Sequence, residues 1–312
     1  MSGLAFVFPG QGTQAVGMGV SLGQRSSVAS HTFEEVDTAL GFELSALMRD
    51  GPVERLGLTE NAQPAILAVG VAAWRVLQEV RPCVPVATAG HSLGEYAALV
   101  AAGVVELGDA VRAVHARGRL MQEAVPVGEG AMAAVISLAP EKIIEVLAGI
   151  STSASPVTVA GFNSPEQTTI SGAKDAVARA SKALVEAGAR RVLPLKVSAP
   201  FHCPLMQPVA APLCRVLEPL QLGPFAMPVV TNVEAAPNTE ASRVKPLLIE
   251  QLTKPVRWVE SVVRMKAMGV SLFVELGAGK SLAGMIKKID PSVLTRSIED
   301  GASLDAALVD LV

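Results

Sequence analysis

The sequence contains few residues of the kinds that mark disulfide scaffolds, metal sites or nucleic-acid-binding surfaces. Its three cysteines, Cys83, Cys203 and Cys214, are odd in number and scattered, which argues against a disulfide framework and against a zinc site. We therefore expect a reducing cytoplasm and no bound metal or cofactor. The 26 basic and 29 acidic residues leave a net charge of −3, so the chain lacks the positive field that nucleic acid requires.

Aromatic residues and long hydrophobic runs are also scarce. Aromatics make up 4% of a chain that is 50% hydrophobic, so its core must consist mainly of Ala, Val, Leu and Ile. The longest apolar runs, at 64–74 and 96–105, are shorter than the ~20 residues that span a bilayer. The first residues have no basic region and lead into a predicted strand. We therefore expect neither a membrane span nor a signal peptide.

The order of the predicted elements indicates an α/β protein with an insert. Short apolar runs that end in turns predict strands at 4–8, 84–88, 228–231 and 272–275. Helical patterns accompany them, at 31–40, 64–80, 93–102, 109–124, 205–217, 244–252, 258–267 and 281–289. This alternation predicts a mainly parallel sheet covered by helices.

The middle of the chain has a different order. Strands are predicted at 131–138, 157–160, 168–171 and 191–197, helices at 140–150 and 173–187, and a turn at 161–165. The order β-α-β-β-α-β is that of the ferredoxin-like arrangement. We therefore predict a discontinuous large domain, residues 1–127 and 199–312, that carries a small subdomain, residues 128–198.

Gly90-His91-Ser92-Leu93-Gly94 is the strongest chemical signal in the sequence. It matches the G-x-S-x-G nucleophile pattern and has the required context, a strand before it and a helix after it. A side chain at Gly90 or Gly94 would crowd so sharp a turn. The turn would raise the Ser92 hydroxyl above the sheet and direct the helix N-terminus, with the Leu93 N–H, at developing negative charge. A chance serine in a glycine-rich turn is the alternative.

A serine nucleophile needs a base, and the chain has four histidines, His31, His91, His115 and His202. His91 adjoins Ser92, so the turn should direct its side chain elsewhere. His31 and His115 lie in amphipathic helical patterns and are expected on the surface. His202 lies in a loop where the large domain resumes, and α/β sheets place their sites on such loops. His202 is therefore the best candidate for the base; a loop histidine without a role is the alternative.

Two glycine-rich stretches resemble nucleotide-binding loops. Gly10-x-Gly12-x-x-Ala15 fits the dinucleotide fingerprint formally, but Pro9 interrupts the turn. Gly279-Lys280-Ser281 resembles the end of a phosphate loop, yet Val274 stands where the first glycine belongs. We interpret the first stretch as a polar loop and the second as an ordinary strand–helix turn.

Several motifs occur in order along the chain: Phe8-Pro-Gly-Gln-Gly-Thr-Gln, Gly90-His-Ser-Leu-Gly-Glu-Tyr, Arg117 before Met121-Gln-Glu-Ala, Phe162-Asn-Ser-Pro, Phe201-His202 and Gln251-Leu-Thr-Lys-Pro-Val-Arg-Trp. On these motifs the chain resembles, over nearly its whole length, the malonyl-CoA:acyl carrier protein transacylases of type II fatty acid synthesis. The resemblance implies a hydrolase-like large domain with an inserted ferredoxin-like subdomain. That agrees with the order of elements predicted above.

The resemblance also implies roles for individual residues. Arg117 would hold the free malonyl carboxylate through a two-pronged guanidinium pair, although a solvated helix face is the default for this arginine from the sequence alone. The backbone N–H groups of Gln11 and Leu93 would form the oxyanion hole. The Gln251 backbone carbonyl would orient the His202 ring in place of a triad carboxylate.

Two more residues are implied to line the substrate cleft. Asn163 would approach it from the small subdomain, with a turn-forming role as the alternative. Phe201 precedes His202, and in related polyketide acyltransferase domains phenylalanine there accompanies malonyl preference, whereas serine accompanies methylmalonyl preference.

The expected reaction is transfer of malonyl from malonyl-CoA to the phosphopantetheine thiol of holo acyl carrier protein. It would proceed through a malonyl-serine intermediate in a ping-pong sequence that supplies fatty acid synthesis. We expect a monomer without nucleic-acid or membrane partners. The alternatives are a serine esterase or thioesterase, a non-catalytic carrier-protein docking subunit, and the same transacylase chemistry in polyketide synthesis or malonate decarboxylase.

Overall fold

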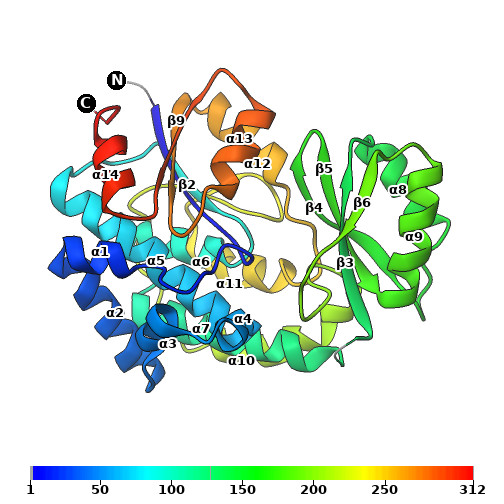
Figure 1. The fold of residues 1–312 in the computed structure, drawn as a ribbon, viewed down its shortest axis with the longest axis horizontal. Coiled ribbons are helices and arrows are strands. Elements are labelled where there is room, and N and C mark those ends of the chain that lie inside the picture. Colours follow the sequence, from blue (N-terminus) through cyan, green and yellow to red (C-terminus); the bar gives the residue numbers. More distant parts are fainter. Residues whose placement is uncertain (1–2, 127, 312) are drawn as a thin grey trace.

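The larger of two sheets has six strands in the order β10-β9-β1-β2-β7-β8 (Figure 1). The structure is a computed structural model that describes residues 3–126 and 128–311. The strands of this sheet are β1 (Gly3–Phe8), β2 (Ala87–Gly90), β7 (Val229–Val230), β8 (Pro237–Asn238), β9 (Val270–Leu276) and β10 (Leu294–Ile298). Neighbouring strands are parallel except for the β7–β8 pair. The mainly parallel sheet that the sequence predicts is therefore confirmed.

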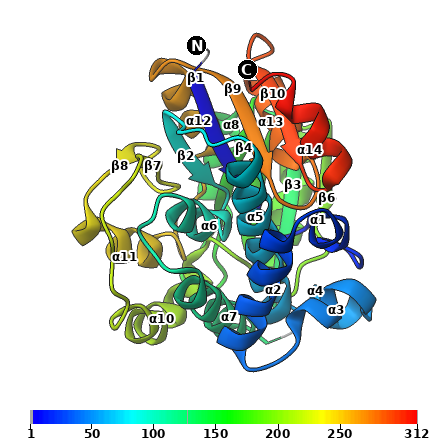
Figure 2. The same cartoon turned by 90° about the vertical axis from the view of Figure 1, so that its left-hand side faces the viewer.

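Helices cover both faces of this sheet. Successive side chains of β1 point to opposite sides and are apolar, so both faces must be buried. Leu4, Phe6 and Phe8 enter the larger core, and Ala5 and Val7 enter the smaller one. The smaller core is closed by α12 (Trp258–Ala267) and α13 (Ser281–Ile289). The helices of the larger core (Figure 2) are α1 (Val20–Arg25), α2 (Ser27–Leu40), α3 (Leu44–Asp50), α4 (Val53–Gly57), α5 (Thr59–Val80), α6 (Gly94–Ala101), α7 (Leu107–Ala124), α10 (Ala210–Leu217), α11 (Ala241–Glu250) and α14 (Gly301–Leu308).

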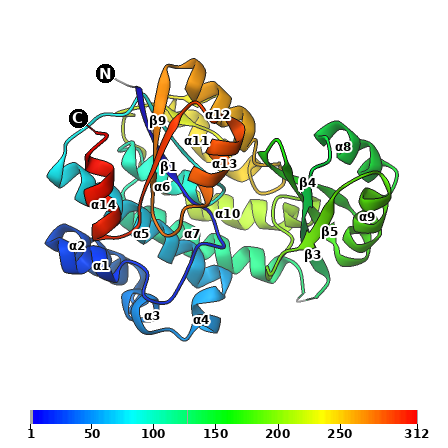
Figure 3. The ribbon, with the colours of Figure 1, turned by 45° about the horizontal axis from the view of Figure 1, so that its top comes forward.

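The second sheet lies to one side of the first and is coloured green in Figures 1 and 3. Its strands are antiparallel, in the order β4-β5-β3-β6: β3 (Gly130–Ile136), β4 (Val157–Ser164), β5 (Gln167–Ala173) and β6 (Arg191–Pro194). Helices α8 (Pro140–Ala148) and α9 (Lys174–Glu186) pack on it through a separate core. The predicted β-α-β-β-α-β order is confirmed.

Backbone hydrogen bonds join the edge strand β4 to a segment of the large unit. Val256, which belongs to the large unit, donates its N–H to Ala160 O and accepts from Phe162 N–H, each at 2.9 Å. β4 continues to Ser164 because it pairs with β5, where Ser164 lies opposite Gln167, so the predicted turn at 161–165 is wrong and Asn163 lies in a strand. Val256 contacts the other side of β4 and comes from a distant segment, which local sequence does not reveal.

The longest helix also differs from the sequence prediction. α5 begins at Thr59 instead of residue 64, and Pro64 lies inside it. Proline has no N–H, so Glu60 O loses its usual helical donor. His115 supplies a donor instead, with Nδ1 2.9 Å from Glu60 O. His115 is therefore half-buried and not a surface residue as expected, whereas His31 is exposed as expected.

Several short elements escape prediction. β2 occupies 87–90 instead of 84–88 and so runs directly into the serine turn. The sequence patterns also miss β8 and β10 and the short helices α1, α3, α4 and α14. These short elements are stabilised by strand pairing or by packing against neighbouring elements, and their own sequences carry no clear periodic pattern.

Residues 3–126 and 128–311 contain neither a membrane-spanning helix nor a cluster of metal ligands. Within these residues no helix is both long and apolar enough to cross a bilayer. In the same residues, no three side chains among His, Cys, Asp and Glu are grouped so that they could hold a metal ion.

Candidate active site

Ser92 sits at the apex of a sharp turn between β2 and α6. Its φ of 54° is left-handed, a conformation that a residue with a side chain rarely adopts. The glycines on either side are required by close approach. A Cβ at Gly90 would lie 1.9 Å from the Gly94 carbonyl, and a Cβ at Gly94 would lie 2.2 Å from Phe8 O. Only hydrogen fits at these positions, so the glycine pattern follows from the packing of the turn against β1.

The Ser92 hydroxyl contacts the ring of His202. Ser92 Oγ lies 2.7 Å from His202 Nε2, and His202 Nδ1 donates to the Gln251 carbonyl at 2.8 Å. That second bond places the ring proton on Nδ1 and leaves the Nε2 lone pair facing the hydroxyl. Burial, followed by the positive charge of Arg117, lowers the pKa of His202 to about 3. The imidazole is therefore neutral at physiological pH, as a general base must be.

Arg117 brings a buried positive charge to the same hydroxyl. It lies on α7, is 1% exposed, and donates from Nη2 to Ser92 Oγ at 3.1 Å and to Gln251 Oε1 at 2.9 Å. Its Nη1 donates to Gln63 Oε1 at 2.8 Å. Among the described residues, Arg117 Nε has no hydrogen-bond partner. The guanidinium thus keeps donor capacity for an anion, and the solvated helix face that sequence alone would suggest is wrong.

Gln11 and Leu93 line the cavity next to Ser92. Gln11 lies in the loop after β1, and Leu93 immediately precedes α6. Within the part of the chain that the structure describes, neither N–H donates to a protein acceptor. Both are therefore available to an oxyanion, and the Leu93 amide adds the positive end of the α6 dipole.

Gln251 is fully buried and connects these groups. Besides its carbonyl bond to His202 and its Oε1 contact with Arg117, its Nε2 donates to Ser92 O at 3.1 Å and to Glu95 Oε2 at 2.8 Å. One side chain therefore contacts the serine turn, the cation and a buried carboxylate, and its backbone orients the histidine.

The small sheet contributes one wall of the site. Asn163 lines the cavity; its Oδ1 lies 2.9 Å from His91 Nε2, and its Nδ2 donates to Thr169 Oγ1 at 3.0 Å. His91 therefore points away from Ser92, toward the small sheet. Phe201, 8% exposed, lies on the wall beside His202. The cavity between the two sheets has a volume of about 270 Å³.

Comparisons with known proteins agree with this geometry. A family model described as acyl transferase domain matches residues 5–290. A malonyl CoA-acyl carrier protein transacylase of Salmonella typhimurium is 44% identical over 308 residues, which are 99% of each chain. One of Bacillus subtilis is 43% identical over 311 residues, which are 100% of this chain and 98% of the relative. The chain belongs to the malonyl CoA-acyl carrier protein transacylase family.

Solved structures place the fold in the same family. An acyl carrier protein S-malonyltransferase of Vibrio cholerae superposes with a TM-score of 0.95 at 47% identity, covering 98% of this chain and 100% of the other. A malonyl-transacylase solved with a type II polyketide acyl-carrier protein superposes with a TM-score of 0.96 at 45% identity, covering 99% and 100%. The large α/β unit with a second antiparallel sheet is therefore the transacylase fold, and the protein is an acyltransferase.

Three buried polar residues of this transacylase site were missed by the sequence reasoning: Gln63, Glu95 and Asn232. A signal existed for one of them, because Glu95 is a single polar residue inside an apolar helical run. Burial raises the pKa of Glu95 to about 7, against the hydrogen bonds from Asn232 N–H and Gln251 that lower it. Asn232 lies in an irregular segment after β7, where no sequence pattern singles it out.

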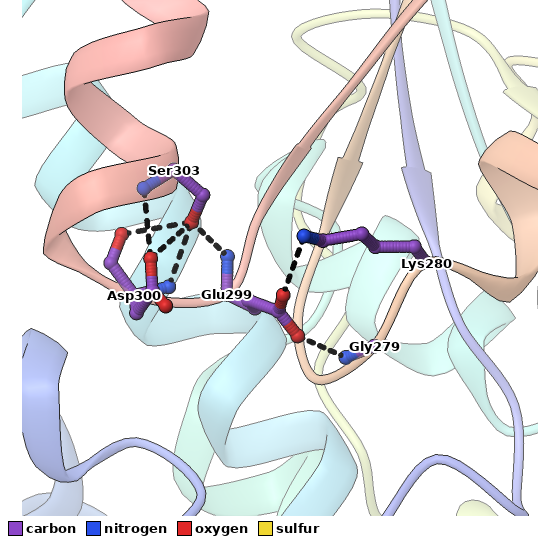
Figure 4. A network of polar contacts seen from close by, with 5 residues as sticks. All are labelled: Gly279, Lys280, Glu299, Asp300 and Ser303. Carbon is purple, nitrogen blue, oxygen red and sulfur yellow. Dashed lines mark hydrogen bonds and ion pairs between the residues drawn. The ribbon is translucent and has the colours of Figure 1, made fainter.

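The phosphate-loop look-alike in this transacylase is a strand–helix turn, as expected. Its amides already have carboxyl partners: Gly279 N–H donates to Glu299 Oε2 at 3.0 Å (Figure 4), and the N–H groups of Leu282 and Ala283 donate to Glu275 at 3.1 and 2.8 Å. Lys280 pairs with Glu299 at 3.1 Å. The turn is neutralised by its own chain, which leaves no place for a phosphate.

Proposed function

We propose that this chain transfers a malonyl group from malonyl-CoA to the phosphopantetheine thiol of holo acyl carrier protein. The observation that carries the proposal is the position of one hydroxyl. Ser92 Oγ lies 2.7 Å from His202 Nε2 and 3.1 Å from Arg117 Nη2. A base suits acyl transfer through serine, and a cation beside it suits an acyl group that carries its own carboxylate.

In the first half-reaction, Ser92 Oγ gives its proton to His202 Nε2 and attacks the thioester carbon of malonyl-CoA. The carbonyl oxygen becomes an oxyanion, which the N–H groups of Gln11 and Leu93 stabilise. The C–S bond then breaks, and the leaving coenzyme A sulfur takes the proton from His202 Nε2. The product is a malonyl ester on Ser92 with a neutral imidazole beside it.

The second half-reaction reverses these steps with a different thiol. The phosphopantetheine thiol of acyl carrier protein gives its proton to His202 and attacks the ester carbon. Ser92 Oγ leaves and recovers the proton from His202 Nε2. His202 thus acts as base and then acid in each half-reaction, and the Gln251 carbonyl stabilises its protonated form by accepting from Nδ1.

Arg117 is assigned the malonyl carboxylate. It is buried, it lines the cavity, and its Nε has no partner among the described residues. An acyl group held at its far end has one productive orientation, so Arg117 would favour attack by a thiol over attack by water. Asn163 and Phe201 are assigned to the walls that surround the acyl and thiol groups.

The pathway that this chain serves, fatty acid or polyketide synthesis, depends on which acyl carrier protein receives the malonyl group. The curated relatives carry the name malonyl CoA-acyl carrier protein transacylase, and one structural relative was solved with an acyl-carrier protein of a type II polyketide synthase. We assign this chain to fatty acid synthesis, and polyketide synthesis remains the second candidate on the strength of that complex.

The remaining assignments concern organisation and location. We assign residues 1–127 and 199–312 to the large domain and residues 128–198 to the subdomain, supported by the two separate sheets and cores. Three free thiols support a reducing cytoplasm. A monomer without nucleic-acid partners is the expected form, and the net charge of −3 supports the absence of nucleic-acid partners.

The test is intact mass spectrometry after brief mixing with malonyl-CoA, with and without holo acyl carrier protein. We expect one malonyl increment on the wild type, none on Ser92→Ala, and loss of the increment with formation of malonyl-carrier protein when the carrier is added. Release of free malonate at the same rate with and without carrier would instead indicate a thioesterase. No adduct on the wild type would reject the serine mechanism.

A further inference from the structure

Asn232 lies directly behind the turn that carries Ser92. β7 pairs with β2 through Val229 and Val230, and this backbone ladder ends two residues before Asn232. Asn232 is 1% exposed. It therefore sits at the point where the sheet stops supporting the chain that leads into the nucleophile.

The carboxamide of Asn232 bonds both limbs of the turn. Oδ1 accepts from Ser92 N–H at 2.6 Å, and Nδ2 donates to the Gly90 carbonyl at 2.6 Å. A carboxamide presents an acceptor and a donor much as a peptide group does. The side chain of Asn232 thus continues the pairing that the backbone of β7 has ended.

Asn232 is itself held from two directions. Its N–H donates to Glu95 Oε2 at 3.1 Å, and its carbonyl accepts from Arg257 N–H at 3.0 Å. Glu95 lies in the first turn of α6, and the same Oε2 accepts from Gln251 Nε2 at 2.8 Å. The serine turn, the helix after it and the residue that orients His202 are connected through these bonds.

This support matters because the turn is strained. Ser92 has a φ of 54°, which a residue with a side chain keeps only where its surroundings hold it. Without the carboxamide, a buried N–H and a buried carbonyl would lack partners, and the turn would relax. A displacement of about 1 Å at the reacting oxygen costs on the order of 10²-fold in rate.

We propose that Asn232 is a positioning residue of the transfer reaction, whose carboxamide holds the Ser92 turn in the geometry that acylation requires. It contacts neither the substrate nor the reacting atoms. The inference rests on the proposed function, because it needs Ser92 to be the acylated residue. The rival explanation is that Asn232 only satisfies buried backbone groups and contributes to stability alone.

The test measures rate and stability separately. Wild type, Asn232→Ala and the milder Asn232→Ser are mixed with malonyl-CoA, quenched at intervals and weighed intact, and melting temperatures are recorded. The malonylated fraction rises exponentially with time. The rate constant of this rise does not depend on how much protein is folded, whereas its amplitude does. Asn238→Ala is the matched control: Asn238 is 4% exposed, accepts from Glu240 N–H and donates to Glu240 O, and does not line the cavity.

We expect Asn232→Ala to lower the acylation rate constant at saturating malonyl-CoA on the order of 10²-fold, with a change of less than about threefold in the half-saturating concentration. Asn232→Ser should be intermediate, and it decides the question if the alanine variant does not fold. Asn238→Ala should lower only the melting temperature.

Two results would overturn the inference: a rate constant within about threefold of wild type in both Asn232 variants, or equal slowing in Asn238→Ala. If the wild type forms no malonyl adduct, the proposed function itself is rejected. That result is distinct from failure of the inference about Asn232, in which the wild type is acylated normally.

Discussion

The turn from β2 to α6 and the turn from β9 to α13 are built alike, yet only the first presents reactive groups. Each follows a buried parallel strand, contains two glycines and opens a helix. In the second turn, Glu299 accepts from the Gly279 amide (Figure 4), and Glu275 accepts from the amides of Leu282 and Ala283 at the helix N-terminus. In the first, the Leu93 amide donates to no acceptor among residues 3–126 and 128–311.

The difference teaches that a helix N-terminus can bind an external anion only where the chain has not already supplied one. A glycine pattern reports how tightly a turn is packed. Whether its amides are free depends on carboxylates such as Glu299, which lies 20 residues from the turn that it neutralises.

The largest effect is expected where the first turn packs against the end of β1. Gly94→Ala would place a Cβ 2.2 Å from Phe8 O, so the backbone must shift and carry Ser92 and the Leu93 amide with it. We expect malonylation of Ser92 to slow on the order of 10³-fold or more. The control is Gly284→Ala on α13, where a Cβ meets nothing within 4 Å. Normal malonylation by Gly94→Ala would contradict the packing argument.

Arg117→Ala comes next. It removes the buried guanidinium that donates to Ser92 Oγ, and loss of a charged, two-pronged carboxylate contact costs about 3 to 4 kcal/mol. We expect kcat/KM for malonyl-CoA to fall on the order of 10²- to 10³-fold, with a much smaller change for acetyl-CoA, which has no carboxylate. Steady-state rates with both thioesters check this. Full malonyl transfer by Arg117→Ala would remove the basis of its assignment.

Glu275→Gln tests the second turn through stability. Burial raises the pKa of the Glu275 carboxyl from 4.5 to about 7. The folded state then holds the proton more tightly than the unfolded state does. The favourable contribution of this group is therefore complete below about pH 4.5 and is lost as the pH rises through about 7.

Glutamine does not titrate, so Glu275→Gln should gain stability relative to wild type as the pH rises from about 5 to about 8, by up to about 3 kcal/mol. Urea unfolding at the two pH values measures this, and Glu299→Gln in the same turn serves as the control. A stability difference that does not change with pH would show that Glu275 keeps an ordinary pKa.

The pH dependence of acylation tests the electrostatics of the first turn. Burial and the charge of Arg117 hold the pKa of His202 at about 3, so the acidic limb of kcat/KM should lie well below pH 6.5. Arg117→Gln removes the positive charge and should move that limb to higher pH, whereas Arg117→Lys should leave it nearly in place. Single-turnover rates between about pH 5 and about pH 8 distinguish the two variants. An unmoved limb in Arg117→Gln would contradict the charge argument.

Glu299→Gln should have the smallest effect. It removes a partly exposed ion pair with Lys280 but keeps an acceptor for Gly279 N–H. We expect the melting temperature to change by less than about 2 °C and malonylation to be unaffected. A large loss of activity would mean that the second turn takes part in the reaction.

Prediction from the sequence worked best where local packing rules are strong. Helices 258–267 and 281–289 begin and end where their apolar periodicity does, and Ser92 follows from a turn that only glycine can flank. It failed where contacts between elements decide the structure. Asn163 lies in a strand because β4 pairs with β5 as far as Ser164, and His115 is half-buried because Pro64 frees a carbonyl on another helix.

By itself, the sequence determined the strand and helix order, the glycine-flanked serine and the choice of His202 among four histidines, because each depends on residues close together in the chain or on the scarcity of a residue type. Only the tertiary structure decided which polar side chains are buried and what they contact. Arg117, Gln251, Glu95 and Asn232 come from four separate segments. Their hydrogen bonds form only when the sheet brings those segments together and excludes water, which no local pattern encodes.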